Sequence, residues 1–270
     1  MEGLSGLGSY VMKAIIKMNI KEQSLLFARL AADAYGKEKA VKKIVKKLGF
    51  TKCKFYDNGG AQAFRFESKT DVVVACRGTQ PSEFNDLKAD LKAFPVKSET
   101  ISRVHRGFKT EVDELWPMVY PDIDGITKNL WFCGHSLGAA MATIMASRCA
   151  HDWDLTDPQC LFTYGSPRVG WPGYIKNLKI CHKRWQNNND IVTRVPFRIM
   201  GYKHCGDLMY IRHDGTIDDS GKSHMWRRFN DRMKGMWGGI KKGKIDNFSD
   251  HAMAEYIPHL EKWNSINTSI

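Results

Sequence analysis

The run Asn129–Ala140 constrains the fold more than any other part of the chain. Its apolar first half ends abruptly on the sequence Gly-His-Ser-Leu-Gly at 134–138, and small helix-forming residues follow. A G-x-S-x-G motif between a strand and a helix is typical of a nucleophile elbow, a strained turn that presents a serine. Glycines two residues before and two after the serine let the strand and the helix pass closely. We therefore predict that Ser136 is a nucleophile at the end of a strand.

The cysteines occur singly and form no C-x-x-C pair. They stand at positions 53, 76, 133, 149, 160, 181 and 205. This pattern argues against a zinc site and against a disulfide framework. Because Cys76, Cys133 and Cys160 lie in apolar runs, we expect buried reduced thiols and a reducing compartment.

The amino-terminal residues lack the basic stretch of a secretory signal, and three polar residues interrupt the apolar segment 11–20. We therefore expect neither a signal peptide nor a transmembrane helix, and we predict a cytoplasmic protein. The net charge of +12 favours contact with anionic surfaces. Charge alone does not separate a phospholipid surface from nucleic acid.

The remaining chain predicts one α/β domain over residues 1–270, since no linker or repeat divides it. A hydrophobic content of 43% is enough for a sizeable core. Helical periodicity is expected over 20–35, 38–48 and 108–120. Strands are expected over 71–76, 130–133, 161–164 and 181–185, with a strand-like region at 202–213 and a hairpin over 53–66 that turns at 57–60.

An ordered set of further motifs carries a family resemblance. The motifs are Arg-Gly-Thr at 77–79, Val-His-Arg-Gly-Phe at 104–108, the elbow, and the segments 163–170, 187–196, 202–206 and 250–256. Over roughly residues 20–260 the chain resembles the class 3 (fungal-type triacylglycerol) lipases. The resemblance implies an α/β-hydrolase fold, with a predominantly parallel central sheet flanked by helices and a short amphipathic lid helix.

The resemblance also implies roles for individual residues. Thr79, through its amide and hydroxyl, and Leu137, through its amide, would form an oxyanion hole. Asp190 follows a predicted strand and would be the acid, and His251 would be the base, in the chain order Ser, acid, His. Taken alone, Thr79 is also compatible with an ordinary turn hydroxyl, and Asp190 with a turn cap.

The other histidines fit the role of base less well. His105 and His135 precede the serine in the chain, so they do not match the expected order. His204 matches a family histidine that we interpret as structural, and His213 lies in the same strand-like region. His251 alone begins the family pattern Asp-His followed by a tyrosine five residues later.

Two amphipathic segments have open interpretations. Residues 81–94 have apolar side chains at helical spacing, which suits a mobile lid or equally a helix packed permanently on the body. The basic segment Trp226–Lys244 suits a helix that lies in an anionic headgroup layer. A structural helix packed near His251 is an equal alternative.

The sequence therefore predicts a serine hydrolase that cleaves carboxylic esters of lipids through an acyl-enzyme. The substrate is expected to be a triacylglycerol or a related ester, with no metal, no cofactor and no nucleic-acid partner. A phospholipase A1-type enzyme and a soluble-ester or feruloyl esterase are alternatives within the same chemistry. A catalytically silent lipid- or nucleic-acid-binding protein would explain the charge but not the ordered catalytic residues. The sequence does not indicate an oligomeric state.

Overall fold

The structure is a computed structural model that describes residues 12–78, 94–221, 230–231, 233 and 249–266. Its centre is an eight-stranded sheet in the order β1-β2-β3-β6-β7-β8-β9-β10. Neighbouring strands from β3 to β9 run parallel, whereas β1, β2 and β10 pair antiparallel. The strands are β1 (Lys52–Asn58), β2 (Ala61–Glu67), β3 (Asp71–Cys76), β6 (Asn129–His135), β7 (Pro158–Tyr164), β8 (His182–Asn187), β9 (Asp207–Ile211) and β10 (Ile217–Gly221). The predicted predominantly parallel sheet is confirmed.

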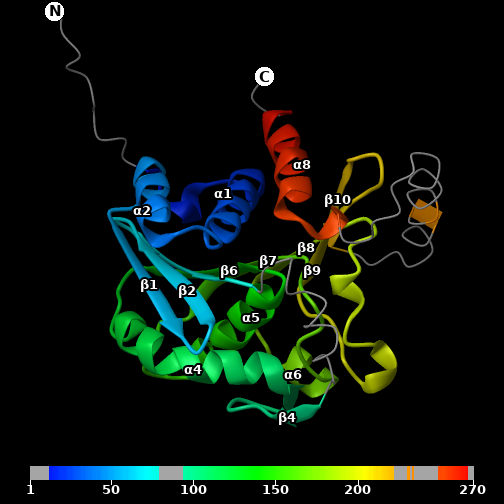
Figure 1. Cartoon of the computed structure of the whole chain (residues 1–270), viewed down its shortest axis with the longest axis horizontal. Helices are drawn as coiled ribbons and strands as arrows, with labels where there is room; N and C mark the ends of the chain where they lie inside the picture. The colour runs from blue at the N-terminus through cyan, green and yellow to red at the C-terminus, as the bar shows by residue number, and fades with distance from the viewer. Residues whose placement is uncertain (1–11, 79–93, 222–229, 232, 234–248, 267–270) are drawn as a thin grey trace, which may run out of the picture.

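Helices cover both faces of the sheet (Figure 1). One face carries α1 (Ile20–Asp33), α2 (Glu38–Lys47) and α8 (Met253–Ser265), and the other carries α4 (Arg106–Ile123), α5 (Leu137–Cys149) and α6 (Pro172–Lys176). A small sheet joins β4 (Pro95–Lys97) to β5 (Arg103–His105), and short 3₁₀ turns are η1 (Ile15–Lys17), η3 (Val192–Arg194), η4 (Arg198–Met200) and η5 (Ser249–His251). The helices predicted over 20–35, 38–48 and 108–120 are all present.

Strand β3 shows how the sequence divides the core between these two layers. Successive side chains of a strand point to opposite faces, so every residue of an apolar strand is buried when helices cover both faces. Val72, Val74 and Cys76 pack with α4 and α5, whereas Val73 and Ala75 pack with α1 and α2. This two-sided burial explains why β3 is uninterruptedly apolar apart from Asp71.

The buried Asp71 carboxylate ties the amino-terminal segment to the sheet. It accepts hydrogen bonds from the main-chain N–H of Ile15 at 3.1 Å and from the Trp131 indole at 2.9 Å, and also from Thr70 and Asn129. A buried carboxylate is tolerated when its lone pairs are satisfied in this way. The segment before α1 is therefore fixed against the central strands.

The expectation that Cys160 is a reduced thiol is wrong. Cys160 and Cys181 form a disulfide, with their Cα atoms 4.5 Å apart. The register explains the pairing, because Leu161 of β7 lies opposite His182 of β8, so that the two preceding residues are also neighbours. The spacing of 21 residues in the sequence does not reveal this proximity. Cys76 and Cys133 are buried and unpaired, as predicted.

One further prediction is confirmed only in part, and two predicted segments lie almost entirely outside the described residues. The strand-like region over 202–213 is a strand from Asp207 to Ile211 only, since Gly206 before it has a positive φ of 74°. The predicted lid helix, apart from Phe94, lies outside the described residues, as does nearly all of Trp226–Lys244. Within the described ranges, no helix is both long and apolar enough to cross a membrane.

Helix α5 approaches the sheet closely at Gly138. A Cβ atom added to Gly138 would lie 2.2 Å from the carbonyl oxygen of Cys76, and one added to Gly134 would lie 2.3 Å from the carbonyl oxygen of Gly138. Both obstacles are main-chain atoms, which cannot rotate away as a side chain can. The two glycines of the elbow motif are therefore required by backbone contact.

We predict that Gly138→Ala lowers the free energy of unfolding by about 3 kcal/mol or more, since the added methyl group forces α5 away from β3. Gly60→Ala is the control, because a Cβ there meets open space although φ is +97°. That change should cost about 1 kcal/mol through backbone strain alone. Urea denaturation measures both, and equal losses would contradict the proposed contact.

Candidate active site

Ser136 lies between the end of β6 and the start of α5. Its φ of 59° and ψ of −129° place a non-glycine residue in a strained region of backbone conformation, as expected of a nucleophile elbow. Its main-chain N–H donates to the carbonyl oxygen of Tyr164 at 3.0 Å, which anchors the turn to β7. Its Oγ is buried and has no hydrogen-bond partner within the described part of the chain. The backbone therefore fixes the position of the hydroxyl, and the hydroxyl itself makes no hydrogen bond to the described residues.

Asp190 and His251 form a direct pair. The Nδ1 atom of His251 lies 3.0 Å from each carboxylate oxygen of Asp190. Asp190 follows β8 and is completely buried, while His251 ends η5 and is 8% exposed. Because an ionised carboxylate only accepts hydrogen bonds, Nδ1 carries the proton in this contact. In the neutral ring Nε2 is then left as the basic nitrogen.

Two further groups fix the carboxylate. The hydroxyl of Tyr256 donates to Oδ2 of Asp190 at 2.6 Å, and the main-chain N–H of Val192 donates to Oδ1 at 2.9 Å. Burial opposes ionisation of Asp190, but the charge and hydrogen bond of His251 and the hydrogen bond of Tyr256 outweigh it and hold the pKa below its ordinary value. Burial raises the pKa of Tyr256, which keeps its phenol protonated as a donor.

Gly165 connects the serine turn to the Asp190–His251 pair. It follows Tyr164, whose carbonyl oxygen holds Ser136, and its φ is +58°. A Cβ atom at this position would lie 2.7 Å from both Oδ2 of Asp190 and Nδ1 of His251. Strands β6, β7 and β8 are parallel, so Ser136, Gly165 and Asp190 all follow carboxyl ends at one edge of the sheet. The structure therefore brings the predicted nucleophile, acid and base to the same place.

His135 supports the base from the other side. Its Nε2 lies 2.7 Å from the main-chain oxygen of His251, and its ring lies against the ring of His251 with centroids 4.4 Å apart. A carbonyl oxygen only accepts, so Nε2 is protonated and Nδ1 accepts from the hydroxyl of Tyr35 at 2.9 Å. Complete burial lowers the pKa of His135 to about 3 and keeps its ring neutral.

The structure describes only one of the two predicted oxyanion-hole residues. Leu137 is the first residue of α5, where the amides of a helix amino terminus point outward and favour negative charge. Thr79 lies outside the described residues. Gly78 before it packs against the elbow, since a Cβ there would lie 2.7 Å from the carbonyl oxygen of His135 and 2.5 Å from the Tyr35 hydroxyl.

The other histidines occupy other environments. His204 donates from Nε2 to the main-chain oxygen of Thr193, three residues after Asp190, in agreement with its interpretation as a structural residue. His105 is buried with its ring 4.2 Å from that of Phe108. His213 contacts the carboxylate of Asp231.

Sequence reasoning assigned no role to Gly165, Tyr35, His135 or Tyr256. The pattern that selected His251 already contained Tyr256, five residues later, but spacing alone does not show that its hydroxyl faces the acid. Gly165 stands at a strand end, where a glycine indicates a close contact. Tyr35 carries no local signal, since its partners lie 100 residues away.

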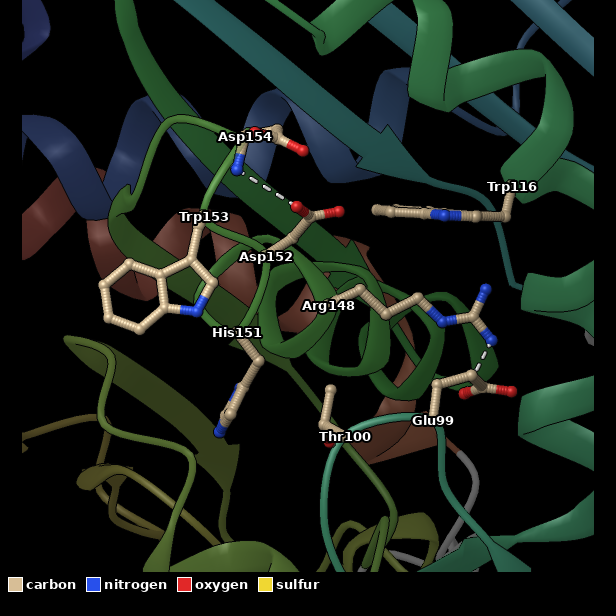
Figure 2. Close-up of a pocket in the computed structure, with 8 residues that line it drawn as sticks. All are labelled: Glu99, Thr100, Trp116, Arg148, His151, Asp152, Trp153 and Asp154. Carbon is tan, nitrogen blue, oxygen red and sulfur yellow. Dashed lines mark hydrogen bonds and ion pairs between the residues drawn. The ribbon is translucent and has the colours of Figure 1, made fainter.

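A cavity of about 460 Å³ lies apart from this site (Figure 2). Arg148, near the carboxyl end of α5, extends along one side toward the carboxylate of Glu99. The cavity is lined by Glu99, Thr100, Trp116, Arg148, His151, Asp152, Trp153 and Asp154. None of the predicted catalytic residues contributes, because Ser136 precedes the opposite end of α5. Among the described residues, no group of three His, Cys, Asp or Glu side chains is placed to hold a metal ion.

A comparison with known protein families agrees with the motifs found in the sequence. Residues 73–200 match the family model described as Lipase (class 3). Over these residues the chain is similar to the class 3 lipases. The predicted resemblance is thereby confirmed, and the matched region holds the elbow and the segment of Asp190.

The chain is similar to three curated proteins. It is 33% identical over 174 residues to "Secreted mono- and diacylglycerol lipase 1" of Fusarium solani, covering 59% of this chain and 49% of that protein. It is 32% identical over 151 residues to "Toxin TseL" of Vibrio cholerae, covering 52% and 23%. It is 29% identical over 189 residues to "Phospholipase A1-II 1" of Oryza sativa, covering 57% and 44%. The chain thus spans half or less of the length of these relatives.

Solved structures of fungal lipases share the fold of this chain. Rhizomucor miehei triacylglyceride lipase superposes with a TM-score of 0.62 at 23% identity, covering 72% of this chain and 82% of that one. Lipase II from Rhizopus niveus gives a TM-score of 0.62 at 21% identity, covering 71% and 80%. The predicted α/β-hydrolase fold is confirmed.

Buried neutral histidines make the stability of the folded chain sensitive to acid. Burial lowers the pKa from 6.5 to about 4 in His105 and to about 3 in His135 and His182, and well below 6.5 in His204. Below pH 6.5 these histidines bind protons in the unfolded chain but stay largely neutral in the folded chain. Stability is therefore full above pH 6.5 and falls as pH decreases, by about 1.4 kcal/mol per pH unit for each fully titrating histidine.

We predict that His105→Phe reduces this slope by about one proton between pH 6.5 and 5, since the ring sits against Phe108 and its nitrogens have no partner among the described residues. The parent chain, measured in the same buffers, gives the reference slope. Urea denaturation at several pH values gives the slopes. An unaltered slope in His105→Phe would show that this histidine titrates normally in the folded chain.

Proposed function

We propose that the chain is a serine hydrolase that cleaves carboxylic esters of lipids, as triacylglycerol lipases do. The observation that carries the proposal is the contact of Nδ1 of His251 with the buried Asp190 carboxylate, beside the elbow of Ser136. With the proton on Nδ1, Nε2 of His251 is the nitrogen that can accept a proton. A carboxylate, an imidazole and a strained serine in this relation are the parts required for acyl transfer.

The reaction begins when Nε2 of His251 takes the proton of Ser136 and Oγ attacks the ester carbonyl carbon. Asp190 keeps the ring oriented and stabilises the imidazolium that forms. The amide of Leu137, together with Thr79, binds the oxygen that becomes negatively charged. His251 then gives the proton to the departing alcohol. A water molecule, deprotonated by His251, then attacks the acyl carbon, and His251 returns the proton to Oγ of Ser136 as the acyl–oxygen bond breaks and the acid leaves.

His135 and Tyr256 act as positioning residues in this scheme. Hydrogen bonds from Tyr256 and the Val192 amide restrain the two oxygens of Asp190. The contact of His135 with the main-chain oxygen of His251 restrains the backbone of the base. Because His135 stays neutral, it adds no positive charge beside the imidazolium that forms on His251.

The comparisons support a lipid ester as the substrate class. Two of the named relatives act, by their names, on acylglycerols or phospholipids. A phospholipase A1-type activity is the second candidate, favoured by the basic composition and by the similarity to the Oryza sativa protein. A soluble-ester esterase has the same catalytic parts, whereas a silent binding protein would have no use for the Asp190–His251 pair.

The extent of the domain and its cellular location are also proposals. We propose one domain over residues 1–270, supported by a sheet that takes strands from 52 to 221. We also propose a cytoplasmic location with peripheral contact to anionic membranes, and the charge of +12 supports that contact. The Cys160–Cys181 disulfide favours an oxidising compartment instead. Fractionation of the source cells, with the Cys160–Cys181 pairing assessed by non-reducing mass spectrometry, separates these locations.

Ser136→Ala should lower ester hydrolysis by at least about 10⁴-fold, since the nucleophile is lost. Its thermal unfolding midpoint should stay within about 2 °C, because Oγ makes no hydrogen bond within the described residues. An organophosphate should label the native chain once, at Ser136. Retained activity in the variant, or a label on another serine, would overturn the proposal.

The triad partners should differ in their effects. His251→Ala should lose nearly as much activity as Ser136→Ala, and Asp190→Asn should retain roughly 10²-fold more than His251→Ala. His204→Ala is the matched control, since His204 contacts the main chain of Thr193 and not the carboxylate. A folded His204→Ala protein without activity, beside an active His251→Ala protein, would show that the base is assigned wrongly. Esters of increasing chain length, a triacylglycerol and a phospholipid distinguish the substrate classes.

A further inference from the structure

Three large apolar side chains are exposed within one tight turn that follows the loop carrying Asp190. Phe197 is 61% exposed, Ile199 94% and Met200 42%. We call residues 197–200 the apolar turn; η4 forms its last three residues. Single exposed apolar residues need no explanation, but several together mark a surface that binds another molecule or a membrane.

Hydrogen bonds hold the apolar turn in a defined shape. The guanidinium of Arg168 donates to the main-chain oxygens of Arg194 and Pro196, which lead into the turn. The N–H groups of Met200 and Gly201 donate back to the carbonyl oxygens of Phe197 and Arg198. Gly201, next in the chain, lies against the indole of Trp171. The exposed side chains are thus presented together on an anchored segment.

The surroundings of the apolar turn in the chain are cationic. No Asp or Glu occurs between Asp190 and Asp207, whereas Arg194, Arg198 and Lys203 do. Arg198 and Lys203 are exposed. Apolar side chains beside cations suit the boundary between acyl chains and anionic headgroups, where both kinds of group are satisfied.

The apolar turn also has a defined relation to the catalytic residues. The segment 188–206 leaves the carboxyl end of β8, at the edge of the sheet where Ser136 follows the parallel strand β6. It is drawn in yellow in Figure 1, beside the green α6. The segment then returns to the amino end of β9, where Asp207 pairs with Lys183 of β8, so the apolar turn lies in the connection between the catalytic edge and the opposite edge of the sheet.

We propose that the apolar turn docks the chain onto an anionic phospholipid surface. Phe197, Ile199 and Met200 enter the acyl boundary, and Arg198 pairs with lipid phosphates. The proposal rests on the proposed lipid-ester hydrolysis, because it names the surface from which the site takes its substrate. It also places the membrane contact on the apolar turn and makes no use of the segment Trp226–Lys244.

The test is co-sedimentation with vesicles of phosphatidylcholine, alone or mixed with phosphatidylglycerol, using Ser136→Ala so that no lipid is cleaved. In this background Ile199→Asp should weaken binding to the anionic vesicles about tenfold or more, because a carboxylate replaces an inserting side chain. Arg198→Gln should weaken it about fivefold, the effect of one interfacial cation. High salt should reduce binding of the parent as well.

Trp153→Asp is the matched control, since Trp153 is fully exposed at the other end of α5 and the change in charge is the same. It should alter binding by less than about twofold if the apolar turn is the contact. Equal losses in Ile199→Asp and Trp153→Asp would overturn the proposal, as would full binding by Ile199→Asp or no binding by the parent. Unfolding midpoints establish that each variant is folded.

The native chain is assayed separately on p-nitrophenyl butyrate below its solubility limit. Absence of hydrolysis there, with Ile199-dependent vesicle binding intact, would reject the proposed function and leave the apolar turn as a lipid-binding surface. Hydrolysis without Ile199-dependent binding would leave the enzyme and reject the docking surface. The two proposals therefore fail by different results.

Discussion

At Gly138, helix α5 contacts the backbone of β3 with no side chain between them. The space that a Cβ would need is already filled by the carbonyl oxygen of Cys76. This contact sets the depth at which the helix meets the sheet, and with it the place of Ser136 directly before the helix. Gly78 and Tyr35 pack around the same turn, so the segment that leads to Thr79 takes its position from the same contact. The position of Ser136 thus depends on glycines, because a residue with a side chain could not make these close contacts.

The second constraint is electrostatic. Asp190 keeps its charge in a completely buried position, which is costly unless the oxygens are well paired. Tyr256, Val192 and His251 supply those partners from α8, η3 and η5. The same interactions that stabilise the buried carboxylate orient the imidazole ring. Support for the fold and preparation for catalysis are therefore provided by one set of hydrogen bonds.

Much of this arrangement could be predicted from the sequence, and the reasons are local. The elbow is contained in five adjacent residues, and α1 begins at Ile20, directly after a capping box formed by Asn19 and Glu22. The places of Asp190 and His251 followed from chain order and family resemblance. What could not be predicted depends on register between strands, which distant residues decide. The Cys160–Cys181 disulfide and the contact of Gly165 with the Asp190–His251 pair both arise from how β7 lies beside its neighbours. The partnership of Tyr35 with His135 joins residues of different layers.

Every residue of α5 is buried, from Leu137 through Cys149, so the helix has no face in contact with water. Surface helices exchange their amide hydrogens through small local openings, but such an opening here would break contacts with the sheet and with α4 at once. The amides of α5 should therefore exchange with solvent deuterium only when the whole structure unfolds. The backbone next to Ser136 then belongs to the slowest-exchanging part of the chain, and the exchange rate of α5 reports the global stability of the fold.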